Sequence, residues 1–198
     1  RAKRITSYLN LVHSLSEKKF EELKTKTFKT GKEIKGYFDM LPDTSQLKQE
    51  FQEFAKNHLN INDLKNWVRQ HLKMGDIDVN IMTKVDKDNY IKKSKLPVEY
   101  NDAHAALRGY ANSNICSSLI LSAGMNPRLY SYIEQFDDFF PDKNGFIKKK
   151  IILKVSDYRS ALIQGKFLAK KGIWVSEYRI ESGLNCGGHA FATHGLLL

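Results

Sequence analysis

The sequence has little cysteine and no long apolar run. Cys116 and Cys186 are the only cysteines among the 198 residues, and no CxxC spacing occurs. Such sparse cysteine excludes a disulfide scaffold and a structural zinc site and is typical of a reducing compartment, so we expect a cytoplasmic protein. No apolar stretch approaches the roughly 20 residues that a membrane-spanning helix needs. The N-terminal residues also lack the apolar core of a signal peptide, so we expect no membrane association.

The motifs of nucleic-acid-binding proteins are absent as well. The net charge of +10 suits an acidic partner, yet the lysines are spread along the chain among Glu and Asp residues. Scattered lysine is typical of a solvated surface, and no RNP, zinc-finger or helix-turn-helix pattern accompanies it. We therefore expect no nucleic-acid partner, because such binding would require the lysines to gather on one face.

Residues 1–74 have the apolar spacing of helices. The first stripe of apolar side chains at this spacing consists of Leu9, Val12, Leu15, Phe20 and Leu23. Two further helices are predicted in residues 44–59 and 61–74. Residues 30–43, which lie before them, contain glycine and proline and predict a loop or a broken helix. We expect residues 1–74 to form a helical segment.

Residues 75–198 show a different pattern, in which short apolar runs alternate with helix-like stretches. The runs predict buried or half-buried strands and are DIDVNIM at 76–82, SSLILSAG at 117–124, KKIILKVS at 149–156 and IWVSEYRI at 173–180. Helix candidates lie between consecutive runs. Strands that alternate with helices form βαβ units and a parallel sheet, so the expected fold class is α/β.

The residues that follow these strands are small, polar or glycine. In sheets of this kind the ligand binds at the carboxyl ends of the strands. The residues there are Asn80 with Met82 and Thr83, then 122–126, then Ser156 with Asp157, and finally 181–189. Turn and cap preferences explain such residues in any single loop. Four such loops in succession, one of them with Gly-Gly-His, favour a ligand site instead.

Three segments carry a family resemblance. DVNIM at 78–82, SAGMNP at 122–127 and GLNCGGH at 183–189 resemble, in order and spacing, the flavin-dependent TIM-barrel oxidoreductases of the nitronate monooxygenase group, which includes flavin-type enoyl-acyl-carrier-protein reductases. The resemblance implies FMN as cofactor, with Asn80 at the FMN-contacting asparagine. It places His189 at the catalytic histidine and Gly187 with Gly188 at the flavin-facing loop. The expected cofactor-binding residues are Asn80, Met82, Ser122, Gly124, Lys154, Gly187 and Gly188.

The resemblance implies an oxidoreductase that acts on a small-molecule substrate. His189 is expected to take a proton from the substrate or to assist its transfer while the flavin exchanges a hydride. Lys154 is expected either to meet the flavin or its phosphate, or to be only the tail of the lysine cluster that begins its strand. A turn followed by a surface histidine is the other interpretation of Gly-Gly-His. Since no carboxylate or cysteine completes a ligand set with His194, no metal site is expected.

The resemblance covers residues 75–195 and leaves a barrel incomplete. Four parallel strands are half of an eight-stranded barrel. We therefore expect residues 75–198 to be a partial (β/α) barrel, an incomplete TIM-barrel-like sheet within a longer chain, whose open edges favour self-association. Asn185 and Cys186 depart from the family pattern, so the substrate stays open. The alternative hypothesis is a truncated or degenerate α/β fragment that acts as a non-catalytic interaction module.

Overall fold

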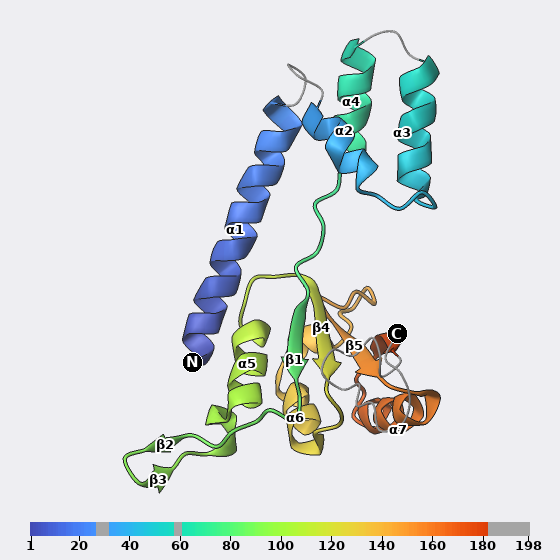
Figure 1. The fold of residues 1–198 in the computed structure, drawn as a ribbon. Helices are drawn as coiled ribbons and strands as arrows, with labels where there is room; N and C mark the ends of the chain where they lie inside the picture. Colours follow the sequence, from blue (N-terminus) through green and yellow to red (C-terminus); the bar gives the residue numbers. More distant parts are fainter. Residues whose placement is uncertain (27–31, 58–60, 182–198) are drawn as a thin grey trace, which may run out of the picture. The chain divides into compact units, whose positions relative to one another are not determined.

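The computed structural model describes residues 1–26, 32–57 and 61–181 (Figure 1). The chain divides into two compact units: Val12–Gly75 forms one, and Arg1–Leu11 together with the described residues from Asp76 onward forms the other. The first helix, α1 (Ala2–Lys26), contributes residues to both units. The expected helical segment 1–74 thus gives its first eleven residues to the unit that contains the sheet.

The first unit is built from the remainder of α1 and three shorter helices, which are α2 (Lys32–Asp39), α3 (Gln46–Asn57) and α4 (Ile61–His71). Of the two alternatives predicted for residues 30–43, a loop or a broken helix, the structure has the second, since α2 ends at Asp39, before Pro42. Ile34 and Phe38 lie four residues apart on one face of α2 and are both buried. The Phe38 ring stacks on that of Phe51 in α3 with 3.8 Å between the ring centroids. This burial stabilises a helix that its glycine weakens.

The second unit contains the predicted parallel sheet, which confirms the α/β fold class (Figure 1). Its strands are β1 (Val79–Met82), β4 (Ser117–Ser122), β5 (Lys149–Val155) and β6 (Val175–Ile180), paired in the order β1-β4-β5-β6. All three pairings are parallel. Each predicted apolar run contains one of these strands. Since the strands follow chain order, each connection crosses to the next strand along the sheet.

Helices form the connections between these strands. The connection from β1 to β4 contains the hairpin β2 (Tyr90–Ile91) and β3 (Ser94–Lys95), the 3₁₀ turn η1 (Val98–Tyr100) and helix α5 (Asp102–Ala111). The next contains α6 (Pro127–Tyr132), η2 (Ile133–Gln135) and η3 (Asp137–Phe139), and the last contains α7 (Tyr158–Ala169). Asn126 and Asp157 begin α6 and α7 because their side chains accept backbone hydrogen bonds as N-caps.

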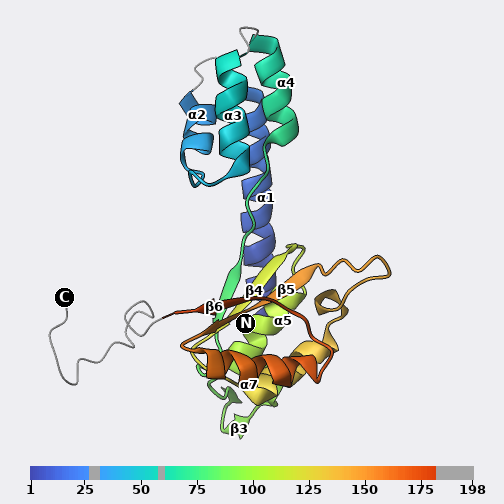
Figure 2. The same cartoon turned by 90° about the vertical axis from the view of Figure 1, so that its right-hand side faces the viewer.

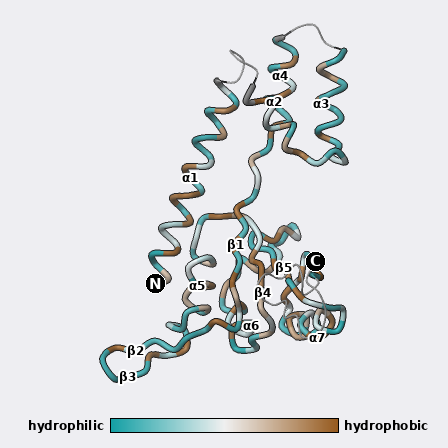
Figure 3. The backbone as a smooth tube through the Cα atoms, viewed as in Figure 1, coloured by the Kyte–Doolittle hydropathy of each residue, from teal (hydrophilic) through white to brown (hydrophobic). Residues whose placement is uncertain are grey.

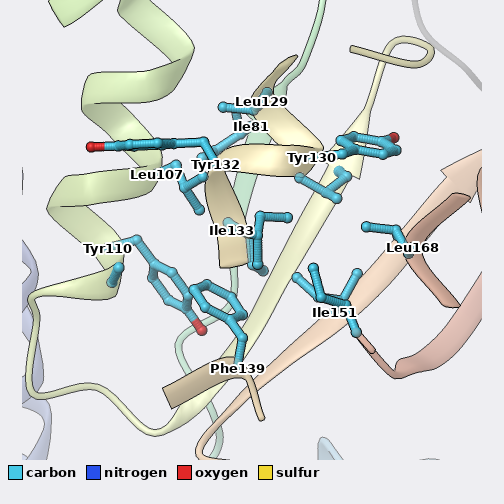
Figure 4. Close-up of a cluster of buried hydrophobic side chains, with 14 of the residues drawn as sticks. Ile81, Leu107, Tyr110, Leu129, Tyr130, Tyr132, Ile133, Phe139, Ile151 and Leu168 are labelled. Atoms are coloured by element: carbon cyan, nitrogen blue, oxygen red, sulfur yellow. The ribbon is translucent and has the colours of Figure 1, made fainter. Parts of the chain in front are cut away.

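All these helices pack on one face of the sheet, as the buried cluster in Figure 4 shows. Leu107 of α5, Leu129 of α6 and Leu168 of α7 are fully buried in one cluster. The strands contribute Ile81, Leu119, Leu121, Ile151, Leu153 and Val155 to the same cluster. The middle of β4 is correspondingly apolar in Figure 3, and α7 packs against β5 and β6 (Figure 2). We call this the covered face of the sheet.

The alternate residues of the strands point to the opposite face, which we call the open face. The strand register places Asn80, Ile120, Ile152 and Glu177 in one row across it. The next row, closer to the carboxyl edge, consists of Met82, Ser122, Lys154 and Arg179. The helices that the structure describes in this unit belong to the core on the covered face. The open face therefore presents polar and charged side chains at its carboxyl end.

A buried lysine lies at the amino end of the covered face. Lys149 is fully buried, and its ammonium donates hydrogen bonds to the carbonyl oxygens of Ser113 (3.0 Å) and Ile115 (2.8 Å). It also lies 4.5 Å from the centroid of the Tyr110 ring. Burial lowers the pKa of Lys149 to about 8. This lysine joins the amino ends of β4 and β5 and does not reach the carboxyl edge.

Candidate functional site

Two predicted residues meet on the open face. The Ser122 hydroxyl donates a hydrogen bond to Asn80 Oδ1, with 2.6 Å between the oxygens. β1 and β4 are adjacent and parallel, so residues near their carboxyl ends come together although they are far apart in sequence. Ser122 is buried and Asn80 is exposed. Asn80 Nδ2 makes no hydrogen bond with any residue that the structure describes. The pair therefore presents an amide donor at the open face.

A sharp turn follows Ser122. Ala123 and Gly124 both have positive φ angles, 59° and 94°. The Thr83 hydroxyl, which is fully buried, lies within hydrogen-bonding distance of the carbonyl oxygens of Ser122 (3.0 Å) and Gly124. The backbone N–H of Thr83 also donates to Ser122 O at 2.9 Å. These bonds fix the ends of β1 and β4 to each other and hold the turn in place.

Gly124 has a packing role that the sequence did not reveal. A Cβ atom built on Gly124 would lie 2.8 Å from Lys84 Nζ and closer still to Lys84 Cε. The end of the Lys84 side chain therefore occupies the space that any other residue would fill at position 124. Position 124 therefore favours glycine for two reasons: its φ angle is positive, and the end of the Lys84 side chain occupies the space of a Cβ. Lys84 was missed by the sequence analysis, although it directly follows the first loop residues that were singled out.

Lys154 lies in the same row of the open face as Ser122, but its charge is already compensated. The Lys154 ammonium lies 2.8 Å from Glu181 Oε2, and both side chains are about three-quarters buried. The backbone N–H of Glu181 donates to Val155 O at 2.9 Å, which continues the pairing of β6 with β5. Neither interpretation of Lys154 included this ion pair. Beside it, Arg179 pairs with Glu177.

Met82, the remaining described member of the predicted set, has an exposed side chain on the open face. Asn80, Met82, Ser122, Gly124 and Lys154 thus lie on the open face or at its carboxyl edge. The three other predicted residues, Gly187, Gly188 and His189, lie outside the described residues, as do Asn185 and Cys186. The described part of the candidate site is therefore its Asn80–Ser122 side.

A second polar cluster, missed by the sequence analysis, fixes the loop after β1. Asp86 Oδ2 lies 2.8 Å from Nδ1 of His104, which is almost fully buried. Asp86 Oδ1 accepts hydrogen bonds from the backbone N–H groups of Ala103 (2.8 Å) and His104 (3.3 Å) at the start of α5. A carboxylate there is stabilised by the free N–H groups of the helix. Asp86 therefore holds the loop against α5.

Asp88 is engaged in the same loop. Lys95 lies 2.6 Å from its carboxylate, and Asn101 Nδ2 donates to it at 2.9 Å. The hydrogen bond from Lys95, followed by that from Asn101, holds the pKa of Asp88 below its usual value, and the charge of Arg128 adds a smaller effect. Next to this loop lies a cavity of about 590 Å³, lined by Lys84, Asp86, Asp88, Asn101, Met125, Asn126, Pro127 and Arg128. It adjoins the loops at the carboxyl ends of β1 and β4.

Within residues 1–26, 32–57 and 61–181, no three His, Cys, Asp or Glu side chains are grouped so that they could hold a metal ion. Over the same ranges, no helix has both the length and the apolar character that crossing a membrane requires.

Comparisons of the chain with protein-family models, with curated proteins and with solved structures found no match. The function must therefore be argued from the residues themselves.

Proposed function

We propose that this chain is part of an FMN-dependent oxidoreductase of the TIM-barrel type, similar to nitronate monooxygenases. One observation carries the proposal. Asn80, Met82, Ser122 and Lys154, which were selected from the sequence, fall in two adjacent rows at the carboxyl end of the open face. Ligands of parallel α/β sheets bind at that end.

The open face offers a flavin a hydrogen-bond donor and an apolar side chain. An isoalloxazine ring is planar and carries carbonyl and ring-nitrogen acceptors along one edge. The unpaired Asn80 Nδ2 supplies a donor for that edge, since its oxygen is held by Ser122. Met82 offers a polarisable surface beside the ring. When bound, FMN supplies the hydride chemistry, and the chain's residues position it.

His189 completes the proposal on the strength of the sequence. We assign to it the transfer of a proton to or from the substrate, a role for which an imidazole with an ordinary pKa near neutrality is suited. Replacing His189 with alanine should leave FMN binding intact and lower turnover of a nitroalkane substrate by about 10² to 10⁴. Loss of FMN binding in this variant, with turnover per bound flavin unchanged, would contradict the role.

The barrel itself is also part of the proposal. Parallel strands in chain order, with their helices on one face, are the repeating unit of a (β/α) barrel. In such a barrel the open face is the interior, and the polar rows at its carboxyl end belong to the site. The scarcity of cysteine supports a cytoplasmic location.

The test is a titration with FMN, followed by visible absorbance and by quenching of flavin fluorescence. Ser122→Ala removes the hydroxyl that orients Asn80 and should weaken FMN binding by about tenfold, the usual effect of one hydrogen bond. Ser118→Ala is the matched control, because Ser118 lies on the same strand and the same face but away from the carboxyl edge. Its affinity should equal that of the wild type.

The titration should be made on this chain and on a version extended at its C-terminus. Binding by either version, with the expected difference between Ser122→Ala and Ser118→Ala, supports the flavoenzyme. If neither version binds FMN, the proposal is wrong, and the alternative of a non-catalytic interaction module is favoured.

A further inference from the structure

Two cations line the cavity beside β1 and β4. Lys84 and Arg128 both line it, and both side chains are exposed. Neither the ammonium nor the guanidinium makes a hydrogen bond or an ion pair with any residue that the structure describes. At a volume of about 590 Å³, the cavity is within the size range of small-molecule sites.

The two carboxylates of the cavity take their hydrogen bonds from other groups, and of the two cations only Arg128 acts on one of them, Asp88, through its charge at longer range. Asp86 accepts from His104 and from the first N–H groups of α5. Asp88 accepts from Lys95 and Asn101. Each negative charge therefore has its own donors. Among the described residues, no hydrogen bond or ion pair joins Lys84 or Arg128 to either carboxylate.

The remaining polar side chains that line the cavity have their donors occupied. Asn126 Nδ2 donates to Thr83 O at 2.8 Å, and Asn126 Oδ1 accepts from the Leu129 N–H. Asn101 Nδ2 donates to Asp88. A ligand in this cavity therefore meets Lys84 and Arg128 as its available donors, and both carry full charge.

The end of the Lys84 side chain lies against the turn after β4. Its side chain lies over Gly124, in the space where a Cβ would be, at the carboxyl end of β4. Lys154, the cation that the sequence suggested for this edge, is instead paired with Glu181. An anionic group at the carboxyl edge would therefore meet Lys84 as an unpaired charge, and Lys154 only as part of an ion pair.

We propose that this cavity binds the phosphate group of a ligand through Lys84 and Arg128. A phosphate carries up to two negative charges and several acceptor oxygens, which suits one ammonium and one forked guanidinium. The site is independent of the flavin proposal, because it is defined by charges outside the open-face rows. The phosphate belongs either to FMN or to a separate phosphate-bearing ligand.

The test uses inorganic pyrophosphate as the probe, titrated by calorimetry at low salt. Lys84→Ala and Arg128→Ala should each weaken binding by about tenfold or more, since each removes a charge-assisted contact. Lys170→Ala and Arg159→Ala are the matched controls, because both are exposed residues of or next to α7, away from the cavity. Both controls should bind pyrophosphate as the wild type does. All four substitutions are at exposed positions, so thermal unfolding should confirm an unchanged fold.

A second arm compares FMN with riboflavin, which lacks the phosphate. If the cavity holds the phosphate of FMN, Lys84→Ala and Arg128→Ala weaken FMN binding and leave riboflavin binding unchanged. The cavity serves a separate phosphate ligand if pyrophosphate binding depends on Lys84 and Arg128 but flavin binding does not. Flavin binding would then be either the same in the two variants as in the wild type, or absent from all three proteins. Pyrophosphate binding that is absent in the wild type, or equal in the cavity variants and the controls, would overturn the proposal whatever the flavin does.

Discussion

The covered face and the open face of the sheet are built from alternate residues of the same four strands, yet they differ in composition and in burial. On the covered face, Leu119, Leu121 and Leu153 are at most 1% exposed. On the open face, Ser118, Ser122 and Ile152 are buried as well, but at the carboxyl end Met82 is 52% exposed and Asn80 is also exposed. Parallel sheets in α/β proteins are usually covered on both faces. The contrast teaches that packing against the helices requires apolar side chains on the covered face, whereas the carboxyl end of the open face accommodates polar ones.

The largest expected difference between the faces is in core packing. Leu153→Ala should lower the free energy of unfolding by about 2 to 5 kcal/mol, because it removes a fully buried side chain and leaves a cavity. Met82→Ala on the open face should cost less than about 1 kcal/mol. Urea unfolding measures both. An equal loss for the two variants would show that the open face is packed as tightly as the covered one.

The pH dependence of stability should reveal the buried Lys149. Burial lowers the pKa of this lysine in the folded chain to about 8 from an ordinary value of 10.5. Between these values the unfolded chain binds more protons than the folded chain, so this lysine makes stability rise with pH. Between about pH 7.5 and about pH 10, the free energy of unfolding of the wild type should gain about 2 kcal/mol relative to Lys149→Met.

The comparison with Lys149→Met is needed because other lysines and tyrosines titrate in the same range. Their contributions cancel in the difference between the two proteins. Urea unfolding at the two pH values gives this difference directly. A difference that does not change with pH would mean that Lys149 keeps an ordinary pKa in the folded chain.

Local patterns were sufficient to predict the sheet. Each of the four strands lies within a predicted apolar run, because a strand buried on one or both faces needs such a run. The sequence left open whether residues 30–43 form a loop or a broken helix, because the burial of α2 depends on distant residues such as Phe51. The packing of the first residues of α1 was also unpredictable. The Thr6 hydroxyl donates to Gly109 O at 2.9 Å, and a Cβ on Gly109 would lie 2.7 Å from Ile5.

As with the fold, the part of the candidate site that depends on strand positions was predictable, and the part that depends on side-chain contacts was not. Asn80 and Ser122 were predicted to follow strands; they lie within β1 and β4 instead, and the parallel sheet brings them together near the carboxyl ends of these strands. The ion pair of Lys154 with Glu181 depends on the register of β5 and β6, which no local pattern specifies. The contact of Lys84 with Gly124 depends on the path of a side chain. Gly124 was selected because SAGMNP resembles a loop of the flavin enzymes, whereas the structure shows that its missing side chain also leaves space for Lys84.

The turn at Gly124 connects the open face to the cavity, and its substitution should affect both stability and ligand binding. Gly124→Ala forces a Cβ into a position with a φ of +94° and displaces Lys84. We expect a loss of about 1 to 2 kcal/mol in the free energy of unfolding from the backbone strain. Pyrophosphate affinity should also fall by about tenfold, because the Lys84 ammonium moves.

Gly145→Ala is the control for this substitution. Gly145 has a φ of +80°, but a Cβ there meets no atom within 4 Å. The backbone strain should be similar, while pyrophosphate binding should be unchanged. Equal pyrophosphate affinity in the two variants would show that Gly124 does not position Lys84.

The smallest expected effect is the coupling between Asn80 and Ser122 on the open face. A double-mutant cycle of Asn80→Ala and Ser122→Ala should give a coupling of about 0.5 to 1.5 kcal/mol in the free energy of unfolding, from their single hydrogen bond. The matched cycle of Asn80→Ala with Ser118→Ala should give none, because no hydrogen bond joins those two described residues. Because Asn80 is exposed, the coupling orients its amide more than it stabilises the fold. Coupling above this range would mean that the open face contributes to folding as the covered face does. Zero coupling would mean that Ser122 does not orient the Asn80 amide. The flavin proposal would then lose the preorganised donor on which it depends.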